Sequence, residues 1–529
     1  MTAADSAETE PGTATGTELS LAAGRVRGRL EGGVAVFRGI PYAQPPVGAL
    51  RFAAPRPATG WAGVRDAGEF GPPCPQVVVA NDIGRPVGDS DGDGAARADD
   101  WLTVNVWSPA LPATDRAARL PVMVWIHGGA YMSGTAGDPG YDGGRLAREG
   151  GVVVVTLNYR IGVEGFAWIE GAPANRGLLD QVAALEWVRD NIGAFGGDPG
   201  RVTVFGESAG AGSIAALLVM ERAAGLFSRA IAQSVPGTYF SPELAADLSA
   251  AIAAELGPDV RPTVAELAAV APDRLVAAGA AVARTMPARE DRWGAVARTA
   301  VPYSPVVDGD VLPRAPWEAL ADGAARDVEL IVGHNRDEYR LFSAMAGQLG
   351  QVTEEQARAV LRAFGPVADS AAAYRAAHPA ADAERLHELV FSDWLFRMPS
   401  LHLARAHADG GGIVRCYELT WPAPATGGAL GACHALDVPL TFGNLTGRLA
   451  TMLMGEEPPA EAEALSARFR AEWTAFAAGR TQWPPYDPKQ PRVLVFDGAA
   501  NAVTDYPEEA SRLLWEAHRF APLPLPAAG

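Results

Sequence analysis

The sequence has few of the features that mark secreted, membrane-spanning or zinc-binding proteins. Its 529 residues include three cysteines, an odd number at wide spacing that suits neither a disulfide framework nor a zinc cluster. No run reaches the roughly 18 apolar residues that a membrane-spanning helix needs. The N-terminal segment also lacks the basic and apolar regions of a signal peptide. These absences favour a cytoplasmic protein.

An excess of positive charge is missing as well. The chain carries 44 lysine and arginine residues against 62 aspartate and glutamate residues, a net charge of −18. Nucleic acids and anionic membrane surfaces repel such a chain, so we expect neither as a partner. Phosphate-binding loops, HExxH motifs and dinucleotide-binding fingerprints are also absent from the sequence. We therefore expect no cofactor and no metal ion.

The composition is that of a folded protein. Hydrophobic residues make up 48% of the chain and charged residues 20%, which excludes extensive disorder. The polar start of the chain is the exception, and we expect a disordered tail over residues 1–20. The sequence contains no repeat of solenoid length. Residues 21–529 are therefore predicted to form a single domain.

Short β-branched runs alternate with helical patterns along most of this domain. The runs are bounded by glycine, proline or polar residues, as is typical of buried strands; they lie at 120–126, 151–159, 201–206, 229–234, 328–333, 413–419 and 492–498. Apolar residues recur at helical spacing over 178–195 and 466–479. This alternation predicts an α/β fold, a mostly parallel sheet with helices on both faces. Two alanine-rich stretches are predicted to be helical insertions, near 235–305 and 340–410.

One motif has a clear chemical meaning. The run 201–206 leads directly into Gly206-Glu207-Ser208-Ala209-Gly210 and then into a small-residue helical pattern, so G-x-S-x-G lies in the strand–turn–helix context of a nucleophile elbow. A strained serine backbone requires neighbours without bulky side chains. Such a turn projects Ser208 Oγ and points helix N–H groups at a developing oxyanion. The alternative is a turn that binds nothing, and the context makes it the weaker interpretation.

A serine nucleophile also needs hydrogen-bond donors for the oxyanion. The N–H after the serine, that of Ala209, is one expected donor, and a glycine loop after an earlier strand supplies others in such enzymes. The sequence His127-Gly128-Gly129-Ala130 follows the run 120–126. It is either a simple tight turn or this loop, and its occurrence together with the elbow favours the loop.

Segments from about residue 24 to the C-terminus resemble the type-B carboxylesterase family, the cholinesterase-like branch of the α/β-hydrolases. They include FRGIPYAQPPVGALRF (37–52), VWIHGGAYMSG (124–134), FGGDPGRVTVFGESAGA (195–211), GHNRDEYRLF (333–342) and GACHALDVPLTFG (431–443). The resemblance implies the α/β-hydrolase fold, with its helical insertions over the active site.

The resemblance also implies a role for each matching site residue. Ser208 is the expected nucleophile, Glu338 the triad acid and His434 the general base. The implied oxyanion-hole donors are Gly129, Ala130 and Ala209. Glu207 and Ser234 match residues beside the triad, the first as an electrostatic influence on it and the second as a holder of the acid.

The residues themselves support this triad in part. The order Ser208, Glu338, His434 is that of α/β-hydrolases, and Glu338 follows the run 328–333 at the sheet edge where active sites collect. Asp337 is about equally placed for the acid, and only the resemblance favours Glu338. Among eight histidines, His434 alone follows a late core strand and lies in a loop. His127 and His334 are expected at the pocket rim but do not fit the chain order.

The sequence departs from the family at several positions. Secreted members close a loop with a disulfide, whose first position is Cys74 here while Trp101 stands at the second, so we expect no bridge. The loop between them has no other aromatic residue to hold a quaternary ammonium group, which disfavours choline esters. Tyr339 replaces the glycine usual after the triad acid, and Asp437 stands where a glutamate is common after the histidine.

A second motif competes for a function. Residues 89–100 (DSDGDGAARADD) fit the start of an EF-hand calcium loop. The flanking helices are missing, and position twelve is Asp100 instead of the usual bidentate glutamate. An exposed acidic loop is the favoured interpretation.

The sequence thus predicts a serine carboxylesterase that hydrolyses small to medium, mainly uncharged esters through an acyl-enzyme on Ser208. Carbamates, amides or a specialised natural-product ester are alternative substrates for the same groups. A non-catalytic binding homologue is weaker, because all three triad residues are present. The expected partner is a small-molecule ester, and the expected state is a monomer or small homo-oligomer.

Overall fold

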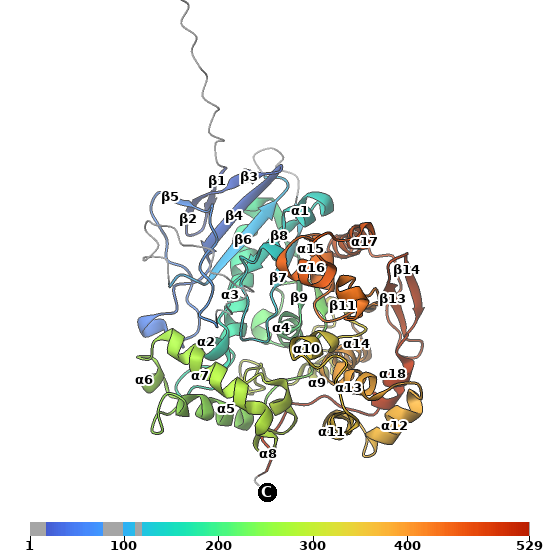
Figure 1. The fold of residues 1–529 in the computed structure, drawn as a ribbon. Helices are drawn as coiled ribbons and strands as arrows, with labels where there is room; N and C mark the ends of the chain where they lie inside the picture. The colour runs from blue at the N-terminus through green and yellow to red at the C-terminus, as the bar shows by residue number, and fades with distance from the viewer. Residues whose placement is uncertain (1–16, 78–98, 112–118, 528–529) are drawn as a thin grey trace, which may run out of the picture.

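The computed structural model describes residues 17–77, 99–111 and 119–527. Its centre is a sheet in the order β14-β13-β12-β11-β10-β9-β7-β8-β6-β4-β3 (Figure 1). The seven strands from β8 to β13 in this order run parallel; they are β7 (Leu120–Ile126), β8 (Val153–Leu157), β9 (Gly197–Glu207), β10 (Arg229–Gln233), β11 (Glu329–Asn335), β12 (Val414–Leu419) and β13 (Arg492–Phe496). They correspond to the seven predicted runs, so the mostly parallel sheet is confirmed.

Antiparallel strands extend both edges of this sheet, and the sequence patterns did not reveal them. Three lie beyond β8, namely β6 (Thr103–Ser108), β4 (Val34–Pro41) and β3 (Arg29–Glu31), and β14 (Asn501–Asp505) lies beyond β13. The outermost strands, β3 and β14, are largely exposed. An exposed edge strand has no continuous apolar run, which is the signal used for the central strands.

The predicted tail is too long at its C-terminal end. Strand β1 (Glu18–Leu21) pairs antiparallel with β2 (Gly24–Arg27), which in turn pairs with β5 (Val64–Asp66) in a separate small sheet. A strand on a half-exposed surface tolerates polar side chains, so the polar composition of this segment does not exclude a strand. Residues 1–16 lie outside the described part of the chain.

Helices cover both faces of the central sheet. Along β7, Val122 and Val124 belong to one apolar core and Met123 and Trp125 to the other, because successive strand residues face opposite sides. The first core includes residues of α3 (Arg176–Asn191), α4 (Ala209–Leu217) and α14 (Met398–Asp409). The second includes residues of α1 (Gly144–Gly150), α15 (Asp437–Phe442) and α17 (Ala460–Ala477). Because the seven central strands run parallel between these two layers, their C-terminal ends lie at one edge of the sheet.

The two alanine-rich stretches are helical. The first contains α5 (Pro242–Ala254), α6 (Val264–Leu267), α7 (Pro272–Thr285) and α8 (Glu290–Trp293); the second contains α11 (Glu354–Phe364), α12 (Ser370–Ala377), α13 (Ala383–Ser392), a π-helical turn (Asp393–Arg397) and α14. In Figure 1, α5 to α8 and α11 to α13 lie at the same end of the molecule, away from β1 and β2. No helix in the described ranges is long and apolar enough to cross a lipid bilayer.

The start of α4 packs unusually tightly against the end of β7. A Cβ atom on Gly210 would lie 2.0 Å from the carbonyl oxygen of Ile126, and one on Gly206 would lie 2.6 Å from the same oxygen. Both contacts are with backbone, which cannot rotate away. These two positions of the G-x-S-x-G motif therefore require glycine for close packing.

We expect Gly210→Ala to lower the melting temperature by several degrees, because overpacking against backbone costs about 1–3 kcal/mol or more. Thermal unfolding followed by circular dichroism measures this. Gly193→Ala is the matched control, since a Cβ atom there meets nothing within 4 Å. Equal melting temperatures for the two variants would contradict the packing argument.

Candidate active site

Ser208 forms the turn between β9 and α4. Its backbone has φ 55° and ψ −124°, a left-handed conformation that costs free energy for a residue with a side chain. Two hydrogen bonds hold the turn: Ser208 N–H donates to the Gln233 carbonyl (2.9 Å), and Gly212 N–H donates to the Ser208 carbonyl (2.9 Å). The Ser208 side chain stays partly exposed. The geometry is that of the predicted nucleophile elbow.

The glycine loop after β7 lies beside this turn. A Cβ atom on Gly128 would be 3.2 Å from Ser208 Cβ. Gly129 has φ 106° and Ala130 has φ 55°, and Gly129 accepts hydrogen bonds from the backbone of Met132 and Ser133. Within the described ranges, neither Gly129 N–H nor Ala130 N–H donates a hydrogen bond. Together with the unpaired N–H at the start of α4, these groups are free to bind an anion.

His434 is joined to Glu338 by a short hydrogen bond. His434 Nδ1 donates to Glu338 Oε2 over 2.6 Å, and His434 N–H donates to the Glu338 carbonyl over 3.2 Å. Both side chains are buried. A buried carboxylate on Nδ1 fixes the ring orientation and leaves Nε2 as the nitrogen that does not bond Glu338.

Two further donors hold the other oxygen of Glu338. Ser234 Oγ donates to Oε1 over 2.5 Å, and Asn335 N–H donates to the same oxygen over 2.8 Å. Ser234 follows β10 and has φ 59°, a conformation that turns the chain at the strand end. The predicted contact between Ser234 and the acid is thus present, and Asn335 is a holder that the sequence did not single out.

Asp337 bonds groups other than His434, and this distinguishes it from Glu338, the other candidate acid. Its Oδ1 accepts from Arg385 Nη1 (2.8 Å) and its Oδ2 accepts from Ala432 N–H (3.0 Å). Neighbouring loop residues point their side chains in different directions, and only Glu338 reaches His434. The sequence could not distinguish them, because the direction depends on the tertiary partner of each.

Glu207 lies on the other side of the imidazole. Its Oε1 is 3.0 Å from His434 Nε2, at ion-pair distance though outside hydrogen-bond geometry. Burial raises the pKa of Glu207 to about 8, against the opposing effect of His434. Burial lowers the pKa of His434, but the carboxylates of Glu207 and Glu338 outweigh it and raise this pKa to about 9. The imidazole is thus held between two carboxylates.

Two histidines expected at the pocket rim are instead fully buried. His127 donates its Nδ1–H to the Gly128 carbonyl (2.8 Å) and stacks on Tyr159. His334 Nε2 lies 3.0 Å from the Tyr506 hydroxyl. Burial lowers the pKa of each to about 4. Both face the interior because they end or follow central strands.

Two aromatic residues that no sequence motif singled out pack on His434. Phe396 stacks on the ring with centroids 4.2 Å apart, and Phe342 approaches it at 5.1 Å. Both come from the second helical stretch, whose pattern shows that its helices are amphipathic but not what they contact. Tyr339, noted as a departure from the family, stacks on Phe391 at 3.9 Å.

Asp437, the other departure, lies beneath the site instead of facing the pocket. It accepts hydrogen bonds from Gln233 Nε2 and the Tyr417 hydroxyl, both at 2.8 Å, and from Asn335 Nδ2 at 3.3 Å. Burial raises its pKa. This network ties the start of α15, just after His434, to the ends of β10 and β11 and to the middle of β12.

Other sequence predictions concern metals and thiols. Residues 89–98 of the possible calcium loop lie outside the described ranges. Elsewhere in the described chain, no group of histidine, cysteine, aspartate or glutamate residues is arranged to hold a metal ion. Cys74, Cys416 and Cys433 are buried free thiols, and Trp101 is buried.

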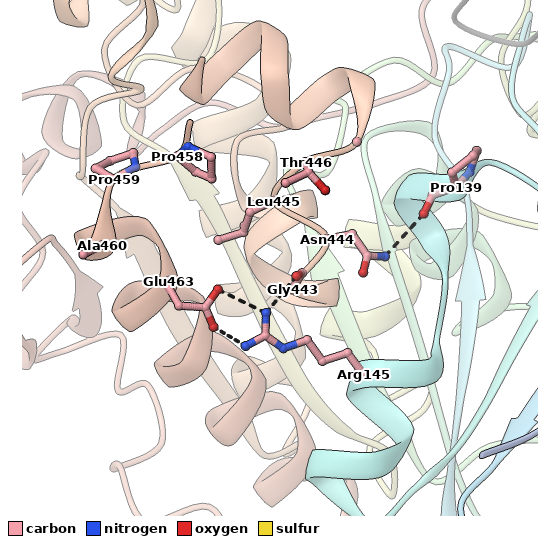
Figure 2. A pocket seen from close by; sticks show the side chains of 11 residues that line it. Pro139, Arg145, Gly443, Asn444, Leu445, Thr446, Pro458, Pro459, Ala460 and Glu463 are labelled. Carbon is pink, nitrogen blue, oxygen red and sulfur yellow. Dashed lines mark hydrogen bonds and ion pairs between the residues drawn. The ribbon is translucent and has the colours of Figure 1, made fainter. Parts of the chain in front are cut away.

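A cavity of about 570 Å³ lies apart from these groups, between α1 and α17 (Figure 2). Arg145 reaches across it to Glu463 and to the Gly443 carbonyl, and Asn444 donates to the Pro139 carbonyl. Its lining contains none of the predicted site residues. Arg145 and Glu463 bind each other, and the Asn444 amide donates to backbone carbonyls.

The comparisons with known proteins agree with this geometry. The model of the carboxylesterase family matches residues 15–515. The chain belongs to this family. It is 38% identical to the para-nitrobenzyl esterase of Bacillus subtilis (strain 168), over 92% of this chain and 96% of that protein. It is 37% identical to the phenmedipham hydrolase of Pseudarthrobacter oxydans, over 93% and 95%.

Solved structures of this family show the same fold. A carboxylesterase of Geobacillus stearothermophilus superimposes with a TM-score of 0.79 at 36% identity, covering 94% of this chain and all (100%) of that one. A para-nitrobenzyl esterase structure gives a TM-score of 0.80, with 94% and 99% covered. The carboxylesterase described here therefore has the α/β-hydrolase fold and is a carboxylic ester hydrolase.

We expect Glu207→Gln to lower the pKa of His434 by about one unit or more, because a carboxylate near Nε2 stabilises the imidazolium. Nuclear magnetic resonance of the labelled histidine ring, titrated with pH, measures this. Glu418→Gln is the control, because this fully buried glutamate on β12 pairs with Arg336 and not with His434, and it should change this pKa far less. An unchanged pKa in Glu207→Gln would refute the role of Glu207.

Proposed function

We propose that this carboxylesterase hydrolyses its esters through an acyl-enzyme on Ser208, with His434 as general base and Glu338 as the triad acid. The observation that carries the proposal is the 2.6 Å hydrogen bond between His434 Nδ1 and a fully buried Glu338. His434 Nε2 also lies 3.0 Å from Glu207, the residue before a serine whose backbone has a positive φ at the end of a parallel strand. A buried acid, an oriented imidazole and a projected hydroxyl are what acyl transfer requires.

The reaction follows from the position of each group. His434 Nε2 takes the proton of Ser208 Oγ as that oxygen attacks the ester carbonyl carbon. The N–H groups of Gly129, Ala130 and Ala209 stabilise the negative carbonyl oxygen of the tetrahedral intermediate. His434 then protonates the leaving alcohol as its bond to carbon breaks. Water repeats the steps on the acyl-enzyme and releases the acid.

Glu207 has to release His434 Nε2 for this cycle. Within the described residues, Ser208 Oγ makes no hydrogen bond, while Nε2 lies near Glu207. Catalytic hydrogen bonds in enzymes without substrate are often long and tighten on binding. We propose that Glu207 stabilises the imidazolium that forms during attack, so that it acts on the charge of the site instead of exchanging protons with substrate.

The substrate class is proposed as small to medium, mainly uncharged carboxylic esters. Phe342 and Phe396 beside His434 support an apolar wall next to the reacting carbon. The negative charge of the chain also disfavours anionic substrates. A cytoplasmic location and a monomeric or small homo-oligomeric state stay predictions from the sequence.

We expect Ser208→Ala to lower turnover of p-nitrophenyl acetate and butyrate by ~10³-fold or more, because the nucleophile is removed. Release of p-nitrophenol measures it. Ser213→Ala is the control: this serine lies on the same helix, where its Oγ accepts from Gln181, and its loss should cost less than about fivefold. Equal slow rates for wild type and Ser208→Ala would refute the proposed nucleophile.

The two neighbouring carboxylates allow a direct test of the triad acid. We expect Glu338→Gln to lower kcat by ~10³-fold or more, because an amide cannot stabilise the imidazolium. Asp337→Asn should lower kcat by less than about tenfold, since Asp337 bonds Arg385 and Ala432. Steady-state kinetics on p-nitrophenyl butyrate compares them. A larger loss in Asp337→Asn would reverse the assignment.

A further inference from the structure

The loop that carries Glu338 is bound along its length by the second helical stretch. Before Glu338, the Arg336 carbonyl accepts from Arg397 Nη1 (3.0 Å). After it, Tyr339 N–H donates to Ser392 Oγ (3.0 Å). The groups that bind the loop at these two points lie at the end of α13 and in the π-helical turn that follows. The end of α13 and this turn therefore bind the chain on either side of Glu338.

Arg397 is the last residue of this turn. Its side chain is fully buried (0% exposed) and bonds in several directions. Nε and Nη2 donate to Asp393 Oδ1 (2.9 and 2.6 Å), and Nη2 also donates to Ser511 Oγ (2.9 Å). Nη1 lies 3.3 Å from Glu508 Oε2. A planar guanidinium held at fixed points cannot move without breaking several of these bonds.

The same turn contacts the general base. Phe396, the residue before Arg397, stacks on the His434 ring at 4.2 Å. The Leu395 carbonyl accepts from Gly237 N–H (2.8 Å), three residues after Ser234. The turn thus touches the chain near each residue that holds or contacts Glu338. π-Helical turns are uncommon and occur often at functional sites, because the extra residue redirects side chains.

From these contacts we infer that Arg397 is a positioning residue for ester hydrolysis: through the Arg336 carbonyl it holds the loop on which Glu338 meets His434. The inference rests on the proposed triad. Ser511 and Glu508 connect Arg397 to α18 (Glu509–Trp515) and the residue before it, so the C-terminal helix also stabilises this loop. The second helical stretch therefore positions the acid through Arg397, in addition to packing on His434 through Phe396.

The test neutralises Arg397 together with Asp393, and Glu508, the other carboxylate near Arg397, keeps Arg336 at 3.6 Å as a partner. In the double variant Arg397→Met with Asp393→Asn, both members of the buried pair become neutral. We expect kcat to fall by at least about tenfold while KM changes less than about threefold, because a displaced acid weakens the transition state more than substrate binding. Active-site titration with a phosphonate ester corrects for unfolded protein.

The pKa of His434 separates positioning from a merely structural or electrostatic role. Three carboxylates raise the pKa of the imidazole: those of Glu207 and Glu338, which contact it, and that of Asp437, which acts from farther away. Displacing Glu338 should lower this pKa by about half a unit or more. Loss of a nearby cation alone would instead raise it. Nuclear magnetic resonance of the ring reads this shift even if no ester is turned over.

The control is a second buried pair of the same kind. Arg160 and Asp180 are both fully buried and bonded at 2.8 Å, and neither bonds the triad. We expect Arg160→Met with Asp180→Asn to lower the melting temperature without moving the His434 pKa. Arg397→Lys should recover part of kcat and pKa, because its ammonium keeps the charge and one donor.

The outcomes separate a positioning role of Arg397 from a merely structural one, and they test the proposed function independently. The inference is overturned if a folded Arg397 variant matches the control pair in kcat and in His434 pKa. If Arg397→Lys is the only variant that folds, it alone tests the inference. We then expect at least a threefold loss of kcat and a lower pKa of His434. If the wild type hydrolyses no ester, or Ser208→Ala is equally active, the proposed function fails. A lower His434 pKa in the Arg397 variants would then still support the inference that Arg397 positions the loop of Glu338.

Discussion

The buried carboxylate of Glu338 is the constraint on which the rest of the site depends. A buried charge is stable only when hydrogen bonds replace its hydration, and here Ser234 Oγ, Asn335 N–H and His434 Nδ1 supply them. These donors come from the ends of two neighbouring parallel strands and from a loop about a hundred residues later. Satisfying one carboxylate therefore brings three distant segments together and fixes the orientation of the imidazole.

The serine side of the site is governed by close packing instead of charge. Gly206 and Gly210 let α4 approach the end of β7 within distances that no side chain permits, and Ser208 accepts a left-handed backbone between them. The glycine loop that follows β7 is consequently adjacent to the serine. Packing of one helix on one strand thus places the hydroxyl beside the backbone donors that are proposed to stabilise the oxyanion.

The sequence predicted the central strands and the elbow well, and it predicted less elsewhere. Buried parallel strands leave continuous apolar runs, whereas β1, β3 and β14 are exposed strands whose polar side chains hide them. Asp337 and Glu338 are equivalent in sequence and opposite in direction, because each is oriented by its own partner. Phe396 and Arg397 lie in a helical stretch whose amphipathic pattern gives no sign of contact with the triad.

The linear sequence by itself determined the fold class, the strained turn at Ser208 and the chain order of the three proposed triad residues, since these depend on local patterns: apolar period, glycine positions and chain order. Only the tertiary structure decided that Glu338 binds His434, that Glu207 faces its other nitrogen, and that Arg397 bonds the Arg336 carbonyl before Glu338. The reason is physical. Hydrogen-bond partners of buried charges are chosen by burial and by three-dimensional proximity, and neither is encoded in the spacing of residues along the chain.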